Sequence, residues 1–108
     1  MRYLTIPGIE LPLSRIALGT AVFSPDVYTQ AAELLDAFIE QGGNCIDTAY
    51  AYGRGGSEQT LGRWLAERGN RTEVVLIGKG CHPIGDSGPR VAPEILRSDL
   101  ATSLERLG

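Results

Sequence analysis

The chain has 108 residues, of which 43% are hydrophobic and 21% are charged, and its net charge is −3 at neutral pH. These values are typical of a soluble globular protein, and no apolar stretch approaches the ~20 residues of a membrane-spanning helix. Its basic residues are scattered, so no surface is expected that follows a nucleic-acid backbone. We therefore expect one unit spanning residues 1–108, without a membrane or nucleic-acid partner.

The N-terminus and the cysteines indicate the compartment. Residues 1–7 lack the apolar core of a secretory signal peptide. Cys45 and Cys81 form neither a disulfide framework nor a zinc-binding pattern, and a single histidine, His82, cannot build a metal site alone. We expect a cytoplasmic protein with two free thiols and no bound metal.

A β-hairpin and a strand are the first predicted elements. Tyr3–Ile6 and Ile9–Pro12 flank Pro7 and Gly8, a pair that favours a type II turn because proline presets φ and glycine tolerates a positive φ. The apolar run Arg15–Thr20 then predicts a strand.

Three helices are predicted after this strand. Ser24 is expected to cap the first helix and Ser57 the second, whereas the third has only Ala92 before Pro93 and so begins without a good cap. The first helix is expected to bury a face with helical spacing: Val27, Ala31, Leu34, Leu35, Phe38 and Ile39. The corresponding side of the third helix comprises Leu96, Leu100, Leu104 and Leu107.

The spacing of the strands predicts a parallel sheet. They end near Gly19, Asp47 and Lys79, which lie 28 and 32 residues apart, the length of a strand, a crossover helix and a return. Such β/α repeats build either an open doubly wound sheet or a (β/α)₈ barrel, and both place ligand chemistry at the C-terminal ends of the strands. Three repeats are fewer than the eight of a barrel, so we expect the chain to be part of a longer one.

Three polar side chains are the candidate catalytic groups. Asp47 and Lys79 follow apolar strands, and Tyr52 lies five residues after Asp47. A phenol has a pKa of about 10, so it needs a nearby cation to transfer protons near neutral pH. Lys79 is the only lysine beside nine arginines, and a partly desolvated ammonium is expected to pair with Asp47.

Two other motifs carry weaker signals. Gly53–Glu58 resembles a phosphate-binding loop, but Glu58 stands where the dinucleotide fingerprint G-x-G-x-x-G requires glycine, which favours a turn at the site instead. His82 follows Lys79 by three residues and is interpreted as an exposed loop residue, with contact to a substrate as the alternative.

Several segments together resemble the N-terminal part of the aldo-keto reductase family. They are Gly19–Ala21, Asp47–Gly53, Ser57–Gly62 and Lys79, and the resemblance covers nearly the whole chain. It implies an α/β fold, a partial (β/α)₈ TIM barrel made of about the first three β/α units, with the N-terminal hairpin closing the bottom of the barrel.

The resemblance also implies an activity, the NADPH-dependent reduction of an aldehyde or ketone to an alcohol. Tyr52 would be the general acid, Lys79 would ease the release of its proton, and Asp47 would pair with Lys79. Gly19, Thr20 and Asp47 would lie beside NADP(H). The histidine that completes the family's site follows the fourth barrel strand, which these residues do not reach, so the isolated chain is expected to be inactive.

Two other functions remain open at this point. A solitary lysine at a strand end also suits a Schiff-base lyase or aldolase, in which Lys79 would trap a carbonyl substrate covalently. A non-catalytic, truncated reductase-like module is the other alternative. In the isolated chain, whichever function it has, unpaired barrel edges and exposed apolar surface are expected to promote self-association or misfolding.

Overall fold

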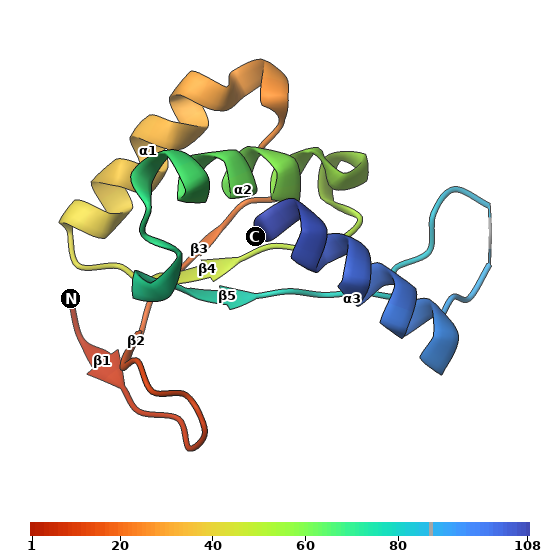
Figure 1. The fold of residues 1–108 in the computed structure, drawn as a ribbon, viewed down its shortest axis with the longest axis horizontal. Coiled ribbons are helices and arrows are strands. Elements are labelled where there is room, and N and C mark those ends of the chain that lie inside the picture. Colours follow the sequence, from red (N-terminus) through yellow and green to blue (C-terminus); the bar gives the residue numbers. More distant parts are fainter. Residues whose placement is uncertain (87) are drawn as a thin grey trace.

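A parallel sheet and a small antiparallel hairpin organise the chain (Figure 1). The computed structural model describes residues 1–86 and 88–108. The sheet has the order β3-β4-β5, and the hairpin pairs β1 with β2. The strands are β1 (Tyr3–Leu4), β2 (Leu13–Ser14), β3 (Ala17–Gly19), β4 (Cys45–Asp47) and β5 (Val75–Ile77). The helices are α1 (Tyr28–Glu40), α2 (Gly56–Arg68) and α3 (Pro93–Leu107). The expected alternation of three parallel strands with helices after a hairpin is confirmed.

The hairpin has the predicted turn but different strands. Ile9 donates its backbone N–H to the carbonyl of Ile6 at 3.1 Å, and Gly8 has a φ of +88°, so the chain does turn at Pro7 and Gly8. Pairing is nevertheless confined to β1 and β2, with Tyr3 opposite Ser14. The reason is that Ser14 is buried and held by Asn44, whose side-chain oxygen accepts the Ser14 backbone N–H at 2.7 Å.

Two predicted helix caps are wrong. Ser24 precedes a 3₁₀ turn, Pro25–Val27, and its side chain forms no capping hydrogen bond; α1 begins after this turn. Helix α2 begins one residue before Ser57, and the Ser57 hydroxyl donates to the carbonyl of Thr20 instead. Only α3 begins as predicted, at Pro93 after Ala92 and without a side-chain cap.

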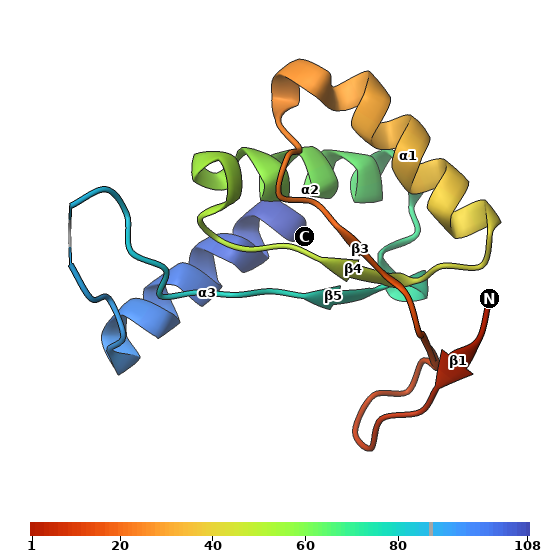
Figure 2. The same ribbon diagram turned by 180° about the vertical axis from the view of Figure 1, so that it is seen from behind.

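The hydrophobic core lies between the helices and one face of the sheet. Trp64, Leu35, Ile46 and Leu61 are fully buried there, and the indole N–H of Trp64 donates to a carboxylate oxygen of Asp36 at 2.8 Å. The remaining members of the core cluster are Phe23, Ala31, Ala32, Leu65, Val74 and Leu107. Figure 1 shows α1 and α2 side by side, and α3 lies in front of the strands in this view and behind them in Figure 2.

Helices α2 and α3 approach each other closely at Gly62. A Cβ atom on this glycine would lie 1.8 Å from the backbone oxygen of Arg106, so no larger residue fits without moving a helix. This contact brings Arg106 to the start of α2.

Several predicted core residues are exposed. Leu34 in α1, and Leu96, Leu100 and Leu104 in α3, each have about half of their surface exposed, and only Leu107 of the α3 leucines is buried. Leu34 therefore lies outside the buried face of α1, which includes Ala31 and Leu35, and the described residues cover Leu96, Leu100 and Leu104 only in part. No helix within residues 1–86 and 88–108 is long and apolar enough to cross a membrane.

Candidate active site

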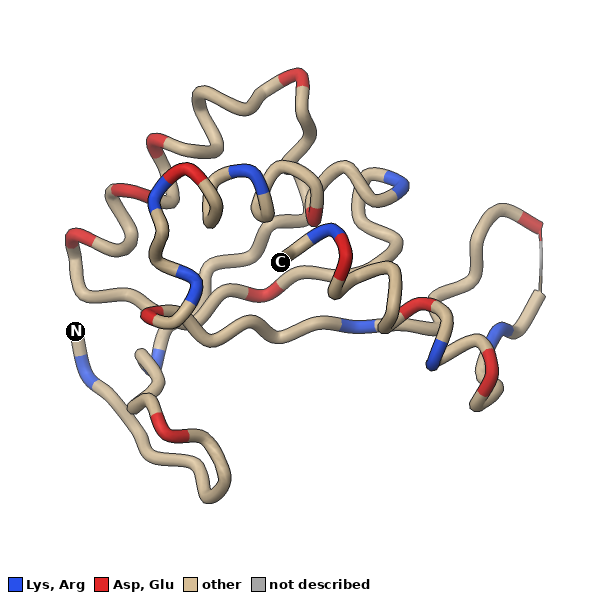
Figure 3. The backbone as a smooth tube through the Cα atoms, viewed as in Figure 1, with Lys and Arg blue, Asp and Glu red and all other residues tan. Residues whose placement is uncertain are grey.

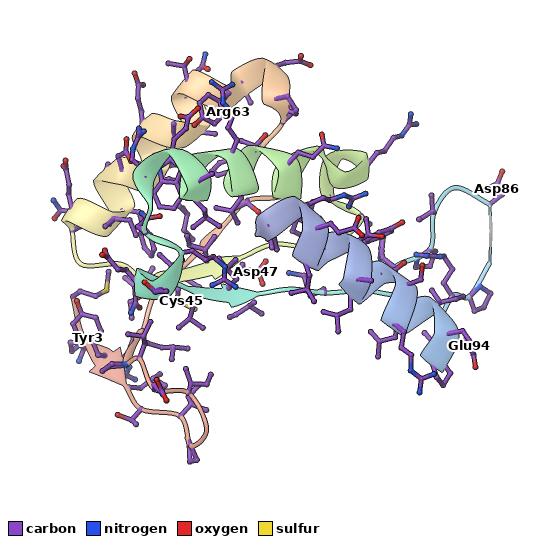
Figure 4. All side chains as sticks on the ribbon, in the orientation of Figure 1. Tyr3, Cys45, Asp47, Arg63, Asp86 and Glu94 are labelled. Atoms are coloured by element: carbon purple, nitrogen blue, oxygen red, sulfur yellow. The ribbon has the colours of Figure 1, made fainter. Side chains whose placement is uncertain are left out.

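The strand register directs Asp47 away from the helices. Gly19, Asp47 and Ile77 are in register across β3, β4 and β5. Ile46 directly precedes Asp47 in β4 and is buried in the core. Successive residues of a strand point to opposite faces of the sheet. Asp47 therefore lies on the face opposite the core, and Figure 4 shows it near the middle of the molecule on β4.

Lys79 forms the predicted ion pair with Asp47. Its Nζ atom lies 2.6 Å from Oδ1 of Asp47 and 2.8 Å from the carbonyl oxygen of Thr48. The strand β5 ends at Ile77, two residues earlier than predicted. Lys79 lies two residues beyond Ile77, so in an extended chain the two side chains point to the same face of the sheet. Two acceptors on one strand end thus hold the ammonium group in place, while both side chains keep contact with solvent.

Tyr52 lies against the same lysine. The Lys79 Nζ atom is 4.9 Å from the centroid of the Tyr52 ring. The adjoining loop is fixed to the sheet because the backbone N–H of Tyr50 donates to the carbonyl of Lys79 at 2.9 Å. Partial burial by itself lowers the pKa of Lys79, but its hydrogen bond to Asp47 and the nearness of Tyr52 raise the pKa above its ordinary value. The ammonium form is therefore stabilised beside the phenol.

Three buried hydroxyl groups fasten the strand ends to α2. The hydroxyl oxygens of Thr20 and Ser57 lie 2.7 Å apart, and those of Thr48 and Ser57 lie 3.3 Å apart. All three residues are fully buried, and Thr20 also donates to the carbonyl of Asp47 at 3.0 Å. Any contact between Thr20 and a cofactor would consequently involve its backbone rather than its hydroxyl.

A buried ion pair that the sequence did not suggest lies behind the site. Nη1 of Arg106 donates to Oε2 of Glu58 at 2.9 Å and to the carbonyl of Tyr50 at 3.1 Å. The guanidinium also lies 4.8 Å from the centroid of the Tyr50 ring. Glu58 is fully buried, which is the signal that sequence reasoning missed when it treated Glu58 only as a departure from a glycine motif.

A second ion pair ties the loop after β5 to α3. Arg90 donates to Asp99 through two nitrogen atoms, at 2.8 and 3.2 Å, and the backbone N–H of Cys81 donates to the same carboxylate at 2.8 Å. Burial alone raises the pKa of Asp99, but the hydrogen bonds from Arg90 and Cys81 outweigh it and hold the pKa below its usual value. Asp99 is separated from Arg90 and Cys81 by nine or more residues, so no local sequence motif predicts these contacts.

Two cavities open at the C-terminal ends of the strands. One, of about 410 Å³, contains Tyr52 and Lys79 in its wall. The other, of about 390 Å³, adjoins it, because Ala51, His82 and Pro83 line both. His82 is exposed, as interpreted from the sequence, and its position leaves open the predicted alternative of a substrate contact.

The surface beside Asp47 has room for a planar group. A Cβ atom built on Gly19, its neighbour in β3, would meet no atom within 4 Å. The open surface at Gly19 has room for a nicotinamide ring, and the Asp47 carboxylate next to it can accept a hydrogen bond from a ribose hydroxyl. The residues present therefore fit the nicotinamide end of the predicted NADP(H) site. Whether they bind it stays a prediction.

Charged groups also meet on the exposed surface of α1 and α2, where Arg68 pairs with Asp36 and Arg63 pairs with Glu67, each at 2.7 Å. Figure 3 shows only acidic residues along α1, whereas acidic and basic residues alternate along α2. Both cysteines are free, with Cys45 buried at the start of β4 and Cys81 partly exposed beyond β5. Within the part of the chain that the structure describes, no three histidine, cysteine or acidic side chains form a group suited to a metal ion.

Comparison with known proteins identifies relatives of this arrangement. Residues 15–108 match the model of the aldo/keto reductase family. Norsolorinic acid reductase stcV of Emericella nidulans is 48% identical over 81 residues, which are 68% of this chain and 21% of that protein. The putative aryl-alcohol dehydrogenase AAD14 of Saccharomyces cerevisiae is 54% identical over 50 residues, covering 46% of this chain and 13% of that protein.

Solved structures agree with the sequence comparison. The glycerol dehydrogenase AKR11B4 from Gluconobacter oxydans superposes with a TM-score of 0.80 and 35% identity, covering 97% of this chain and 35% of that one. These 108 residues thus span about a third or less of the relatives' length. The predicted partial (β/α)₈ barrel is confirmed, because the hairpin and three β/α units match part of that family's barrel.

Proposed function

Because the chain belongs to the aldo-keto reductase family, we propose that it serves in the NADPH-dependent reduction of an aldehyde or ketone to an alcohol. The observation that carries this proposal is the cluster at the strand ends, where Lys79 contacts Asp47 at 2.6 Å and lies 4.9 Å from the centroid of the Tyr52 ring. A carboxylate, an ammonium and a phenol in this order can deliver one proton to a carbonyl oxygen.

Each side chain has one task in this proposal. Tyr52 donates its phenolic proton to the carbonyl oxygen as the carbonyl carbon is reduced, and it regains a proton from solvent after the alcohol leaves. Lys79 stabilises the phenolate because its ammonium charge lies beside the ring. Asp47 keeps Lys79 protonated and fixed, in agreement with the raised pKa of that lysine.

Gly19 and Asp47 are the residues proposed to hold the cofactor. When bound, NADPH supplies the hydride that the carbonyl carbon accepts. The open surface at Gly19 would receive the nicotinamide ring, and the Asp47 carboxylate would accept a hydrogen bond from a ribose hydroxyl. Thr20 supports this floor through its buried hydroxyl bonds.

We further propose that turnover requires the β/α units that follow in the relatives. The chain covers 35% of the matched glycerol dehydrogenase, and the inner face of its three strands has no opposing wall among the described residues. Water therefore reaches the Asp47 and Lys79 side chains, which weakens the electrostatic interactions that a closed site would strengthen.

A chimera tests the proposal directly. The 108 residues are joined to the part of the Gluconobacter glycerol dehydrogenase that follows the matched region, and NADPH consumption is measured with benzaldehyde and with a small aliphatic aldehyde. The aromatic probe is chosen because one relative is named as a putative aryl-alcohol dehydrogenase. We expect turnover by the chimera and none by the 108-residue chain alone.

Two tyrosine variants separate chemistry from folding. Tyr52→Phe should lower kcat by a factor of roughly 10² to 10⁴, the contribution of a positioned general acid. Tyr28→Phe is the matched control, because the Tyr28 hydroxyl bonds to Glu67 on the outer side of the helices, and it should leave kcat unchanged. Equal activities of wild type and Tyr52→Phe would refute the assigned role.

The Schiff-base alternative is disfavoured by one observation. Imine formation needs a neutral amine, and the raised pKa of Lys79 keeps the ammonium form dominant at neutral pH. Borohydride reduction in the presence of an aldehyde should therefore leave Lys79 unmodified, as judged by peptide mass spectrometry. Covalent trapping at Lys79 would favour the lyase.

A further inference from the structure

The cavity beside the Tyr52 cleft has an unusual wall. It measures about 390 Å³, and its lining residues include two arginines, Arg54 and Arg106, together with Tyr50. None of the described residues that line it is acidic, although the chain as a whole carries a net negative charge. The cavity thus presents hydrogen-bond donors and positive charge next to the groups proposed to reduce a carbonyl.

Arg54 lines this cavity, and its exposed side chain has no partner among the described residues. It lies in the turn Tyr52–Gly55 with a φ of +54°, a left-handed conformation that a non-glycine residue adopts only at an energetic cost. Its side chain forms no ion pair or hydrogen bond with the described residues, so no internal contact explains why an arginine occupies this position. Residues in strained conformations cluster at ligand sites.

Arg106 adds further unused donors. Only its Nη1 atom is engaged, by Glu58 and by the Tyr50 carbonyl. A guanidinium has five N–H groups, and the three on Nε and Nη2 have no acceptor in the described part of the chain. Glu58 is fully buried beneath it, whereas the Arg106 side chain keeps a fifth of its surface exposed, so the face toward the cavity is cationic.

We propose that this cavity binds a carboxylate carried by the carbonyl substrate, with Arg54 and Arg106 as its ligands. The inference rests on the proposed function, because it assigns the second end of a molecule whose carbonyl lies at Tyr52. Glu58 neutralises one of the two arginines, which leaves one uncompensated positive charge, enough for a carboxylate but not for a phosphate dianion. Planar guanidinium groups also match the two oxygens of a carboxylate.

The substrate class follows from the two adjoining cavities. Ala51, His82 and Pro83 line both, so a ligand that reaches across these residues would occupy the cleft and the cationic cavity together. Tyr50 and Ala51 supply apolar surface along the way. The expected ligands are aldehydes or ketones with a carboxylate at the far end of a short apolar body.

Nuclear magnetic resonance on the ¹⁵N-labelled 108-residue chain tests this assignment by binding alone. The probes are 4-formylbenzoate and methyl 4-formylbenzoate, which differ in charge but little in shape. We expect the carboxylate to bind about fivefold more tightly than the ester, as for one solvent-accessible ion pair, and to shift the Nε–H signals of Arg54 and Arg106. Equal affinities would overturn the proposal.

Variants locate the effect. Arg54→Asn removes the charge, and asparagine tolerates the positive φ. This variant should bind 4-formylbenzoate only as tightly as the ester, with the affinity for the ester unchanged. Arg54→Lys should restore part of the difference between the two affinities. Arg71→Asn is the matched control, since Arg71 is exposed just before β5, at the other end of the strands, and it should change neither affinity. Loss of the preference in Arg71→Asn would indicate a general charge effect and refute the subsite.

The cofactor is the competing source of an anion. Adenosine 2′,5′-bisphosphate, titrated in the same way, should leave the Arg54 signal in place; a larger shift than with 4-formylbenzoate would overturn the proposal in favour of a cofactor phosphate. Equal kcat/KM for acid and ester in an active chimera would also refute the subsite and leave the reduction intact. A carboxylate preference in binding without any turnover would refute only the reduction.

Discussion

Two ion pairs at the same end of the sheet differ in exposure. Lys79 and Asp47 keep 43% and 34% of their side-chain surface exposed, whereas Arg106 and Glu58 keep 20% and 0%. An exposed pair contributes little stability because water screens it, whereas removing one partner of a buried pair leaves an uncompensated charge. The exposed pair is thus suited to chemistry with a ligand, and the buried pair holds α3 against the start of α2.

Breaking the buried pair is expected to have the largest effect. Glu58→Gln removes the charge that faces Arg106 in a fully buried position and should lower the free energy of unfolding by about 3 kcal/mol, measured by urea denaturation. Glu67→Gln on the same helix is the control, because the Glu67–Arg63 pair is exposed, and its effect should be much smaller. Similar losses in both variants would contradict the distinction between the two kinds of pair.

The ion pair between Arg90 and Asp99 should make the protein sensitive to acid. A lowered pKa means that the Asp99 contribution to stability is present above the unfolded value of about 3.9 and is lost as the pH falls through the lower folded value. We expect the free energy of unfolding to decrease below about pH 4 in the wild type and to depend less on pH in Asp99→Asn. Parallel curves for the two proteins would show that other carboxylates cause the acid sensitivity.

Removing the exposed pair should separate activity from stability. Asp47→Asn is expected to change the free energy of unfolding by no more than about 0.5 kcal/mol, because solvent screens the pair, but to lower kcat of the chimera at least tenfold. The pKa of Lys79 is raised, so its contribution to stability is present below about pH 10.4 and is lost as the pH rises through the folded value. A large stability loss with full activity would reverse the roles of the two pairs.

The pairing of Asp47 with Lys79 could be predicted from the sequence, because the end of a strand determines where each residue lies. Asp47 and Lys79 follow apolar runs in successive β/α repeats, and parallel strands bring such ends to one edge, so their pairing could be predicted. The left-handed turn at Arg54 is indicated only weakly in the sequence, by the glycines on either side of it. The hairpin register could not be predicted, because it depends on a contact between Asn44 and Ser14, which lie 30 residues apart in the sequence.

The buried polar groups behind the site could not be predicted in the same way. Ser57 looks like a helix cap from its position, yet its hydroxyl is used by Thr20 and Thr48, which come from two other segments. The burial of the α3 leucines could not be predicted for a different reason. Their spacing defines a face correctly, but spacing does not say whether anything covers it, and Leu96, Leu100 and Leu104 stay exposed within the described chain.

The smallest predicted effect concerns the strain at Arg54. A left-handed conformation costs most residues about 1 kcal/mol or more, and asparagine tolerates it better than arginine. Arg54→Asn should therefore raise the free energy of unfolding by about 0.5 kcal/mol, whereas Arg71→Asn, in ordinary backbone geometry, should not. A gain in stability together with loss of carboxylate binding would show that the arginine is retained for its ligand. A loss in stability would instead mean that its side chain supports the fold, and Arg54 would then belong with the buried pair rather than with the exposed site.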